Sequence, residues 1–319
     1  MKEISLVIPL KNEEKSIRGL IDSICAQTVL PDEVIFVDGG SSDGTKSIIR
    51  KNIDKFLVEM RLIEMKKAYP GEARNAGVAE SMHDFIAFTD GGILLDKKWL
   101  EELTRPMAKD NAIDVVYGAY EPILDSFIKE CSLMGYIPPR EKIRGLAFRT
   151  NFIASSIFKK CICDNIKGFP SFRAAEDKIF MDKVEKSGAK ISYTDKAIVY
   201  WQIPGSLKGI FKRFSEFSAH DILAGRARDW HHSVFRTYAA LIFFFSMGIL
   251  LNPLFLWGIL AVWVLRLGHM FIKKTKDFKV KFLLDPRYFF GIAFVVLATD
   301  MALFCGSLKY LRMYYEKNK

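Results

Sequence analysis

The chain has little cysteine, and its cysteines follow no repeated spacing. The five are Cys25, Cys131, Cys161, Cys163 and Cys305. The pair Cys161 and Cys163, which we expect on a strand, would be half of a metal site without a second half. These positions argue against a disulfide framework, so we predict reduced thiols in a cytosolic domain.

A long apolar segment is missing from the N-terminus, because residues 1–10 already have the pattern of a short strand. We therefore expect no signal peptide. A concentrated basic cluster is missing too, although the formal net charge is +10. The basic residues are dispersed or flank apolar segments near the C-terminus. We predict a membrane surface or an anionic phosphorylated substrate as partner, and no nucleic acid.

Short apolar strands alternate with amphipathic helical stripes through the first 120 residues. The expected strands cover residues 4–9, 33–37, 61–65, 85–88 and 115–120. Alternation of this kind, with short connections, predicts an α/β fold with a mostly parallel sheet and helices on both faces.

The strand 85–88 has no polar alternation, which suits a central strand covered on both faces. It leads into Asp90, Gly91 and Gly92. Open α/β sheets bind ligands beyond the carboxyl ends of their strands, and a carboxylate there suits a divalent cation that carries phosphates. The alternative is that Asp90 only begins a turn.

Residues 121–201 are less regular, with a strand expected near 152–158. Glu176 and Asp177 begin a helix, where acidic side chains are also favoured by the helix dipole alone. An amphipathic basic helix follows over 207–217. It is suited equally to a bilayer surface and to a domain core.

The C-terminal third is strongly apolar. Residues 234–272 are long enough for a transmembrane hairpin that turns at Asn252-Pro253, and residues 289–308 supply a further transmembrane or re-entrant segment. The basic loop 273–281 predicts a cytoplasmic catalytic domain on a multi-pass cell-membrane protein. Asp300 lies within the last segment and needs an interhelical partner there.

Several ordered motifs together resemble the family-2 glycosyltransferases with the GT-A fold, here with a C-terminal membrane anchor. The resemblance covers residues 1 to about 225, which divide into a nucleotide-sugar half (1–120) and an acceptor half (121–225). The motifs that carry it are Val7-Ile8-Pro9-Leu10-Lys11-Asn12-Glu13-Glu14, Val37-Asp38-Gly39-Gly40-Ser41-Ser42-Asp43-Gly44-Thr45, Ala73-Arg74-Asn75-Ala76-Gly77, Asp90 and Glu176-Asp177.

The resemblance implies a role for each matching residue. It places the nucleotide-sugar donor against Pro9, Asn12, Glu13, Asp38, Ser41, Arg74, Asn75 and Asp90. Arg74 and Asn75 would face the diphosphate, Asp90 would hold a divalent cation (Mg or Mn), and Asp177 would be the general base beside Glu176. A diphosphate leaving group gains negative charge as the glycosidic bond breaks, so cationic partners suit it.

Two departures from the family pattern bear on these expectations. Family members usually carry Asp-x-Asp where this chain has Asp90-Gly91-Gly92, so the second carboxylate is missing. No Gln-x-x-Arg-Trp run follows the base, and the membrane part is small, which disfavours a processive synthase with its own export channel.

We expect an inverting glycosyltransferase that moves a single sugar to a membrane-associated, lipid-linked acceptor in cell-envelope glycan or glycolipid biosynthesis. One alternative is a polyprenyl- or dolichyl-phosphate sugar synthase. Another is a sugar-nucleotide-binding membrane protein whose catalysis is impaired, which the missing carboxylate motivates. A nucleotidyltransferase is disfavoured, because no glycine-rich, lysine-bearing loop follows the first strand.

Overall fold

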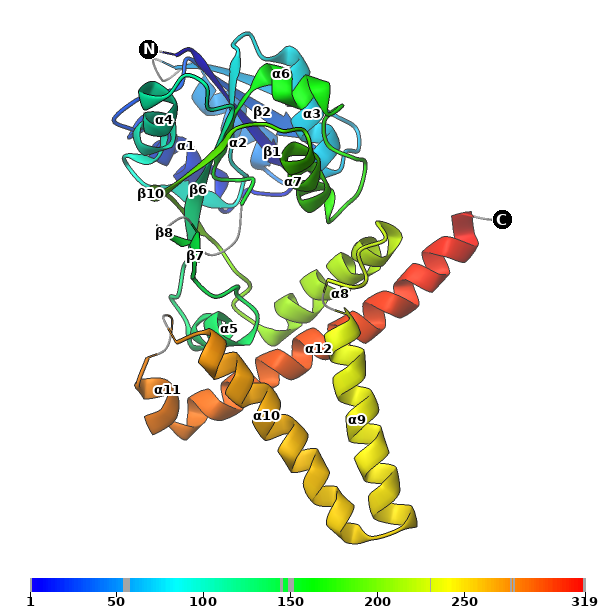
Figure 1. The fold of residues 1–319 in the computed structure, drawn as a ribbon. Helices are drawn as coiled ribbons and strands as arrows, with labels where there is room; N and C mark the ends of the chain where they lie inside the picture. The colour runs from blue at the N-terminus through cyan, green and yellow to red at the C-terminus, as the bar shows by residue number, and fades with distance from the viewer. Residues whose placement is uncertain are drawn as a thin grey trace. The chain divides into compact units, whose positions relative to one another are not determined.

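The computed structural model describes residues 2–53, 58–143, 146–148, 152–229, 231–275, 277 and 279–317. The chain forms two compact units, each built from two segments (Figure 1). The first comprises Met1–Ile123 and Glu141–Ile203, and the second comprises Leu124–Arg140 and Pro204–Lys319.

A mixed sheet runs through the first unit. In spatial order its strands are β3 (Glu59–Glu64), β2 (Glu33–Asp38), β1 (Ile4–Leu10), β4 (Phe85–Phe88), β9 (Ser156–Lys159), β6 (Val115–Pro122), β10 (Ile191–Trp201) and β5 (Ile93–Leu95). The strands β1 to β4 are parallel, as are β6 and β10. Strand β9 is antiparallel to both β4 and β6, and β5 is antiparallel to β10. A short hairpin of β7 (Glu141–Ile143) and β8 (Leu146–Phe148) stands apart from this sheet.

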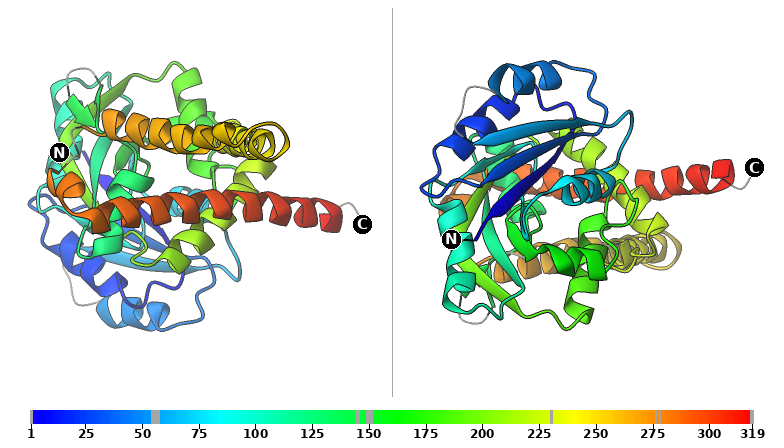
Figure 2. Two further views of the ribbon diagram at one scale, coloured as in Figure 1. Left: turned by 90° about the horizontal axis from the view of Figure 1, so that it is seen from below. Right: turned by 90° about the horizontal axis from the view of Figure 1, so that it is seen from above.

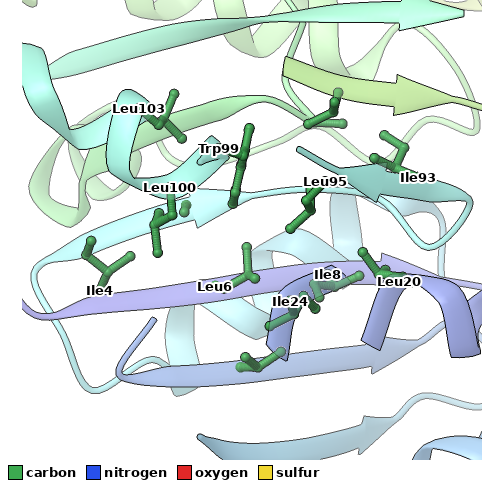
Figure 3. Close-up of a cluster of buried hydrophobic side chains, with 14 of the residues drawn as sticks. Ile4, Leu6, Ile8, Leu20, Ile24, Ile93, Leu95, Trp99, Leu100 and Leu103 are labelled. Carbon is green, nitrogen blue, oxygen red and sulfur yellow. The ribbon is translucent and has the colours of Figure 1, made fainter. Parts of the chain in front are cut away.

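Helices cover both faces of the sheet. Successive residues of β1 point to opposite faces, so Leu6 and Ile8 enter one core and Val7 the other. The first core, shown in Figure 3, is completed by α1 (Ile17–Cys25), α2 (Thr45–Ile53) and α4 (Trp99–Lys109). The second is completed by α3 (Pro70–Glu80), α6 (Lys160–Asn165) and α7 (Glu176–Lys186). The predicted fold class is confirmed.

Two local predictions need correction. Cys161 and Cys163 lie in helix α6, not on a strand, and the strand expected near 152–158 begins only at Ser156. Short apolar runs suit a buried strand and a buried helix equally well, so their pattern alone does not distinguish the two.

The second unit is helical. It contains α5 (Phe127–Gly135), α8 (Leu207–Leu223), α9 (His231–Leu250), the 3-10 turn η1 (Pro253–Leu256), α10 (Trp257–Lys273), α11 (Lys281–Leu284) and α12 (Pro286–Lys317). Helix α12 is long and straight in both views of Figure 2. Its glycines allow close approach, because a Cβ on Gly291 would lie 2.6 Å from Cys131 Sγ and one on Gly306 would lie 2.4 Å from Ser218.

Helix α8 packs within the second compact unit. Ile210 and Phe214 of α8 share a buried cluster with Ile292 and Val295 of α12, so α8 belongs to the helical unit. Residues 124–140, predicted within the acceptor half, belong there as well. An amphipathic stripe shows that a helix has an apolar face, but not which partner covers it.

Three helical segments are long and apolar enough to cross a membrane, namely His231–Leu250, Pro253–Lys273 and Pro286–Glu316. They contain the segments predicted from the sequence. Asp300 accepts two hydrogen bonds from Arg266, at 2.6 and 2.7 Å, and one from Tyr238 at 3.3 Å. The expected interhelical partner is therefore present. Residues 276 and 278 of the basic loop lie outside the described residues.

Candidate active site at the carboxyl edge of the sheet

Two loops interlock where β1 and β2 end. The backbone N–H of Asn12 donates to Ser41 Oγ at 2.8 Å, and the N–H of Ser42 donates to the Asn12 side chain at 2.9 Å. The N–H of Glu13 donates to Thr45 Oγ1 at 2.8 Å. Asn12 has a φ of 58°, a left-handed conformation that asparagine tolerates well. The loop that carries Asn12 and Glu13 is thus held against the loop that carries Ser41.

Asp38 is fully buried at the end of β2. Its Oδ1 atom accepts hydrogen bonds from the N–H groups of Gly40 and Ser41, at 3.0 and 2.8 Å. Its Oδ2 atom is buried and has no hydrogen-bond partner within the described part of the chain. Buried carboxylate oxygens are costly unless paired, so Oδ2 is suited to accept from a bound ligand.

Arg74 joins the carboxylates of two distant segments. Arg74 is only 2% exposed. One terminal nitrogen of its guanidinium lies 2.7 Å from Asp90 Oδ1, and the other lies 3.1 Å from Glu176 Oε1. The planar fork of arginine suits two acceptors at once. Helix α3 supplies the guanidinium, while its partners come from the end of β4 and from the start of α7.

Arg74 carries one positive charge among the carboxylates of Asp90, Glu176 and Asp177. Burial by itself would lower the pKa of Arg74, but the negative charges of Asp90, Glu176 and Asp177 raise it. Burial and the neighbouring charge of Asp177 raise the pKa of Glu176 to about 7, although Arg74 opposes this. One guanidinium shared among three carboxylates does not compensate them all. The cluster is therefore suited to a further cation or a proton.

Asp177 occupies the first turn of α7, where the N–H of Lys178 donates to its Oδ1 at 2.7 Å. The preceding Ala175 has a φ of 68°, a left-handed conformation that is strained for a residue with a Cβ. After this turn Glu176 lies against the first turn of α3, where a Cβ on Gly71 would lie 3.1 Å from Glu176 Cγ.

Two predicted residues serve the framework instead of facing open space. The side chain of Asn75 donates to the carbonyl of Phe169 and accepts from its N–H, both at 2.8 Å, so both of its polar groups are occupied. Pro9 is buried within β1, where its carbonyl accepts from Gly91 N–H at 3.3 Å. The Asn75 side chain holds Phe169 in this structure, and its contact with the diphosphate stays a prediction.

The sequence gives no sign of the aromatic ring that lies against Arg74, that of Phe169. The Arg74 guanidinium lies 5.3 Å from the ring centre of Phe169, which stacks on Phe180 at 3.7 Å. No spacing in the sequence connects Phe169 to Arg74, because the two residues are about 95 positions apart. The roles of the other predicted site residues remain predictions.

The donor set for a divalent cation is small. Among the described residues, no group of three or more His, Cys, Asp or Glu side chains is close enough to hold a metal ion. The glycines after Asp90 leave a cradle, however. A Cβ on Gly92 would lie 3.3 Å from one carboxylate oxygen of Glu13 and 3.5 Å from the other. The Glu13 carboxylate therefore lies beside the glycines that follow Asp90, and carboxylate oxygens are ligands that suit a cation carrying phosphates.

The fold of the chain is similar to that of solved glycosyltransferases of the GT-A class. The structure of the mannosyltransferase PcManGT from Pyrobaculum calidifontis, in complex with GDP-Man and Mn2+, matches with a TM-score of 0.57 and 17% identity. That match covers 97% of this chain and 87% of the other.

Residues 5–159 match the family model described as Glycosyl transferase family 2, so the chain carries a family-2 glycosyltransferase domain. The predicted family resemblance is confirmed.

Two curated relatives are similar over about 60% of this chain. The O-antigen chain rhamnosyltransferase RfbN of Salmonella typhimurium is 28% identical over 62% of this chain and 65% of its own length. The cholesterol galactosyltransferase of Borreliella burgdorferi is 23% identical over 60% of this chain and 58% of its own length. The match thus spans less than two thirds of either relative.

Proposed function

We propose that the protein is an inverting glycosyltransferase that moves one sugar from a nucleotide-sugar donor to a lipid-linked acceptor at the membrane. The observation that carries the proposal is the cluster in which Arg74 joins Asp90 and Glu176, with Asp177 beside them. Such a cluster, at the carboxyl edge of a nucleotide-binding type of sheet, supports a reaction in which a diphosphate departs and a hydroxyl loses a proton.

The donor's nucleoside lies against the interlocked loops after β1 and β2 in this proposal. The buried Oδ2 atom of Asp38 accepts a hydrogen bond from the base or ribose. Asn12 and Ser41 hold the two loops together, so they shape the pocket whichever of their atoms touch the nucleoside. A divalent cation, when bound to Asp90, would neutralise charge that develops on the diphosphate.

The acceptor hydroxyl gives its proton to Asp177 as it attacks the anomeric carbon. Attack from the face opposite the leaving diphosphate inverts the configuration at that carbon. Glu176 is tied to Arg74 at 3.1 Å and so orients the turn that presents Asp177. Arg74 in turn holds Asp90 in place, so it acts on the diphosphate through Asp90.

A lipid-linked acceptor is supported by the second unit. Its three long apolar helices suit a multi-pass cell-membrane anchor, and the basic residues around them suit a cytoplasmic catalytic domain. One relative is named cholesterol galactosyltransferase, and the acceptor in that name is a lipid. Two relatives' names, O-antigen rhamnosyltransferase and cholesterol galactosyltransferase, are consistent with a role in cell-envelope glycan or glycolipid synthesis.

Replacement of Asp177 by Asn tests this mechanism. We expect the full-length protein with Asp177→Asn to bind the donor normally but to lose at least about 100-fold in transfer rate, because the base is gone. A panel of UDP-, GDP- and dTDP-sugars with Mg or Mn, read by thermal shift, first identifies the donor. Asp182→Asn, on the same helix, is the matched control. Unchanged transfer in Asp177→Asn would refute the assigned base.

A catalytically impaired nucleotide-sugar-binding protein is the second candidate, favoured by the glycine at position 92. It predicts donor binding without turnover for any metal and any acceptor. A polyprenyl- or dolichyl-phosphate sugar synthase is distinguished by its acceptor, since a phosphate is already ionised and needs little help from a base. Asp177→Asn would then retain most of its transfer activity.

A further inference from the structure

Position 92 and Glu13 compete for the same space. A Cβ on Gly92 would lie 3.3 and 3.5 Å from the two carboxylate oxygens of Glu13, and 3.7 Å from its Cδ. A Cβ on Gly91 would lie 2.9 Å from Glu13 Cγ and 2.8 Å from Leu10 Cβ. The two glycines therefore leave the room that the Glu13 side chain fills.

An aspartate at position 92, as in the Asp-x-Asp pattern, would bring a second carboxylate against that of Glu13. Two like charges only a few ångströms apart repel each other strongly where water is partly excluded. Glycine at position 92 thus removes one carboxylate from a place that another carboxylate already occupies. In this chain the Glu13 carboxylate is thus the one that lies beside position 92.

Glu13 is held firmly in this place. Its N–H donates to Thr45 at 2.8 Å, and its carbonyl accepts from the N–H groups of Ser16 and Ile17 at the start of α1. Ser16 also donates from its hydroxyl to the Glu13 carboxylate. The loop after β4 is tied to β1, the strand that leads into the Glu13 loop, by the hydrogen bond from Gly91 N–H to the Pro9 carbonyl. The loop that carries Glu13 and the loop that carries Asp90, Gly91 and Gly92 are therefore neighbours, and backbone hydrogen bonds hold both in place.

Asp90 alone is a weak cation ligand in this setting, because Arg74 already takes its Oδ1 at 2.7 Å. Magnesium and manganese sites that carry phosphates use one or two carboxylates, and their affinity depends on the charge of the ligands. We propose that Glu13 supplies the second carboxylate of the divalent-cation site, in the place where the Asp-x-Asp pattern has its last aspartate. This deepens the proposed function and rests on it.

The test measures Mn2+ binding to the full-length protein in detergent by electron paramagnetic resonance, with UDP and GDP as separate probes. We expect Glu13→Gln to weaken Mn2+ binding by about tenfold or more. Glu14→Gln, which removes the same charge from the neighbouring residue, should leave it within about twofold. Nucleotide binding in EDTA, together with thermal stability, reports whether Glu13→Gln has damaged the pocket itself.

A swap of the carboxylate makes the test specific. The double variant Glu13→Ala with Gly92→Asp should regain most of the Mn2+ affinity that Glu13→Ala loses, whereas Gly92→Asp alone should not improve it. The proposal is overturned if Glu13→Gln binds Mn2+ like the wild type, if the double variant binds no better than Glu13→Ala, or if EDTA-resistant nucleotide binding falls as far as Mn2+ binding. Mn2+ binding through Glu13 without any sugar transfer would refute the proposed function alone.

Discussion

Arg74 is the residue on which the acidic cluster depends. It is buried, it bonds Asp90 and Glu176 through separate nitrogens, and it lies against the ring of Phe169. A buried charge that is paired on both sides is costly to disturb, since loss of the cation leaves two carboxylates facing each other. The positions of Asp90 and of the turn before Asp177 are therefore coupled through one side chain.

Replacement of Arg74 by Lys keeps the positive charge but removes the planar guanidinium, whose two terminal nitrogens bond separate carboxylates. A single ammonium group does not reach both carboxylates with the same geometry, so we expect a loss of about 1–3 kcal/mol in the free energy of unfolding. Sugar transfer should fall as well. Thermal unfolding of the purified protein and a transfer assay check this. Arg105→Lys, at an exposed ion pair, is the control and should change stability by less than about 0.5 kcal/mol. Equal stability of the two variants would contradict the bridging role.

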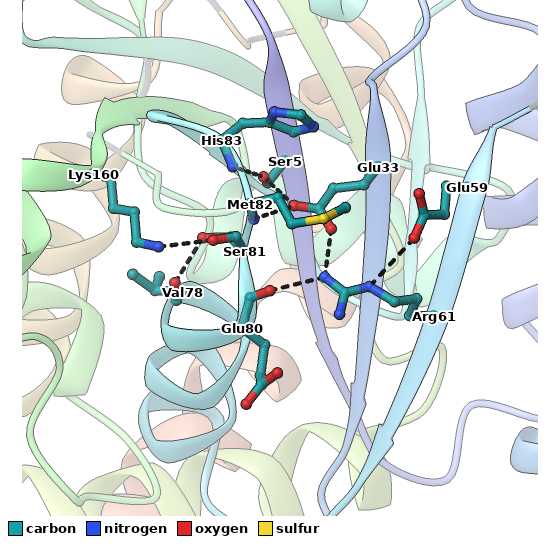
Figure 4. A network of polar contacts seen from close by, with 10 residues as sticks. All are labelled: Ser5, Glu33, Glu59, Arg61, Val78, Glu80, Ser81, Met82, His83 and Lys160. Carbon is teal, nitrogen blue, oxygen red and sulfur yellow. Dashed lines mark hydrogen bonds and ion pairs between the residues drawn. The ribbon is translucent and has the colours of Figure 1, made fainter.

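At the scale of elements, the opposite end of the sheet is held by a second buried carboxylate. Glu33 at the start of β2 is fully buried and accepts from Ser5 at 2.5 Å, Met82 N–H at 2.6 Å and Arg61 at 2.5 Å (Figure 4). These contacts join β1, β2, β3 and the segment after α3. Burial would raise the pKa of Glu33, but its three hydrogen bonds outweigh burial and lower it.

Replacement of Glu33 by Gln should destabilise the protein at neutral pH by about 1–3 kcal/mol, because charged hydrogen bonds become neutral ones. A carboxyl whose pKa is lowered on folding contributes stability above its unfolded pKa, near 4.5, and that contribution is lost as the pH falls through the folded value. The difference in the free energy of unfolding between the wild type and Glu33→Gln should thus narrow below about pH 4.5. Thermal unfolding at several pH values measures it, and a gap that widens toward acid would contradict the account.

At the scale of the whole molecule, the helical unit contains a hairpin with an apolar tip. Between Arg236 and Arg266 the sequence has no charged residue. Leu250, Leu251 and Leu254 at the tip are each at least 70% exposed. Arg266 is neutralised by Asp300 of α12, which removes the cost of an isolated charge among apolar helices. These features suit a hairpin inserted in lipid.

Thiol labelling in a variant without native cysteines tests whether the hairpin crosses the bilayer. We expect a cysteine placed at Asn252 to react with a membrane-impermeant reagent added outside intact cells, because the tip should emerge on the far side. A cysteine at Thr275, in the basic loop, should react only after the membrane is permeabilised. Labelling of the Asn252 site only in detergent would show that the tip stops inside the bilayer. Labelling of the cysteine at position 275 in intact cells would show the reverse orientation.

Patterns within the sequence suffice to predict the α/β alternation, the family resemblance and the apolar segments. Each of these is a local property, since strand runs, helical stripes and ordered motifs depend on residues close together in the chain. Asp38, Asp90 and Glu176 were recognisable because their motifs are short and each lies at the end of a strand or the start of a helix. The same local character explains why the apolar stripe of α8 does not reveal which helix covers it.

Which distant residues come into contact depends on how the helices and strands pack. Arg74 and Glu176 are about a hundred positions apart, and their bond depends on α3 and α7 packing on the same face of the sheet. The antiparallel β9, the pairing of Asn75 with Phe169, and the Glu13 carboxylate beside Gly92 are likewise long-range results of packing. A motif shows that a carboxylate is absent from its usual position, whereas only the packed loops show that another side chain fills the space.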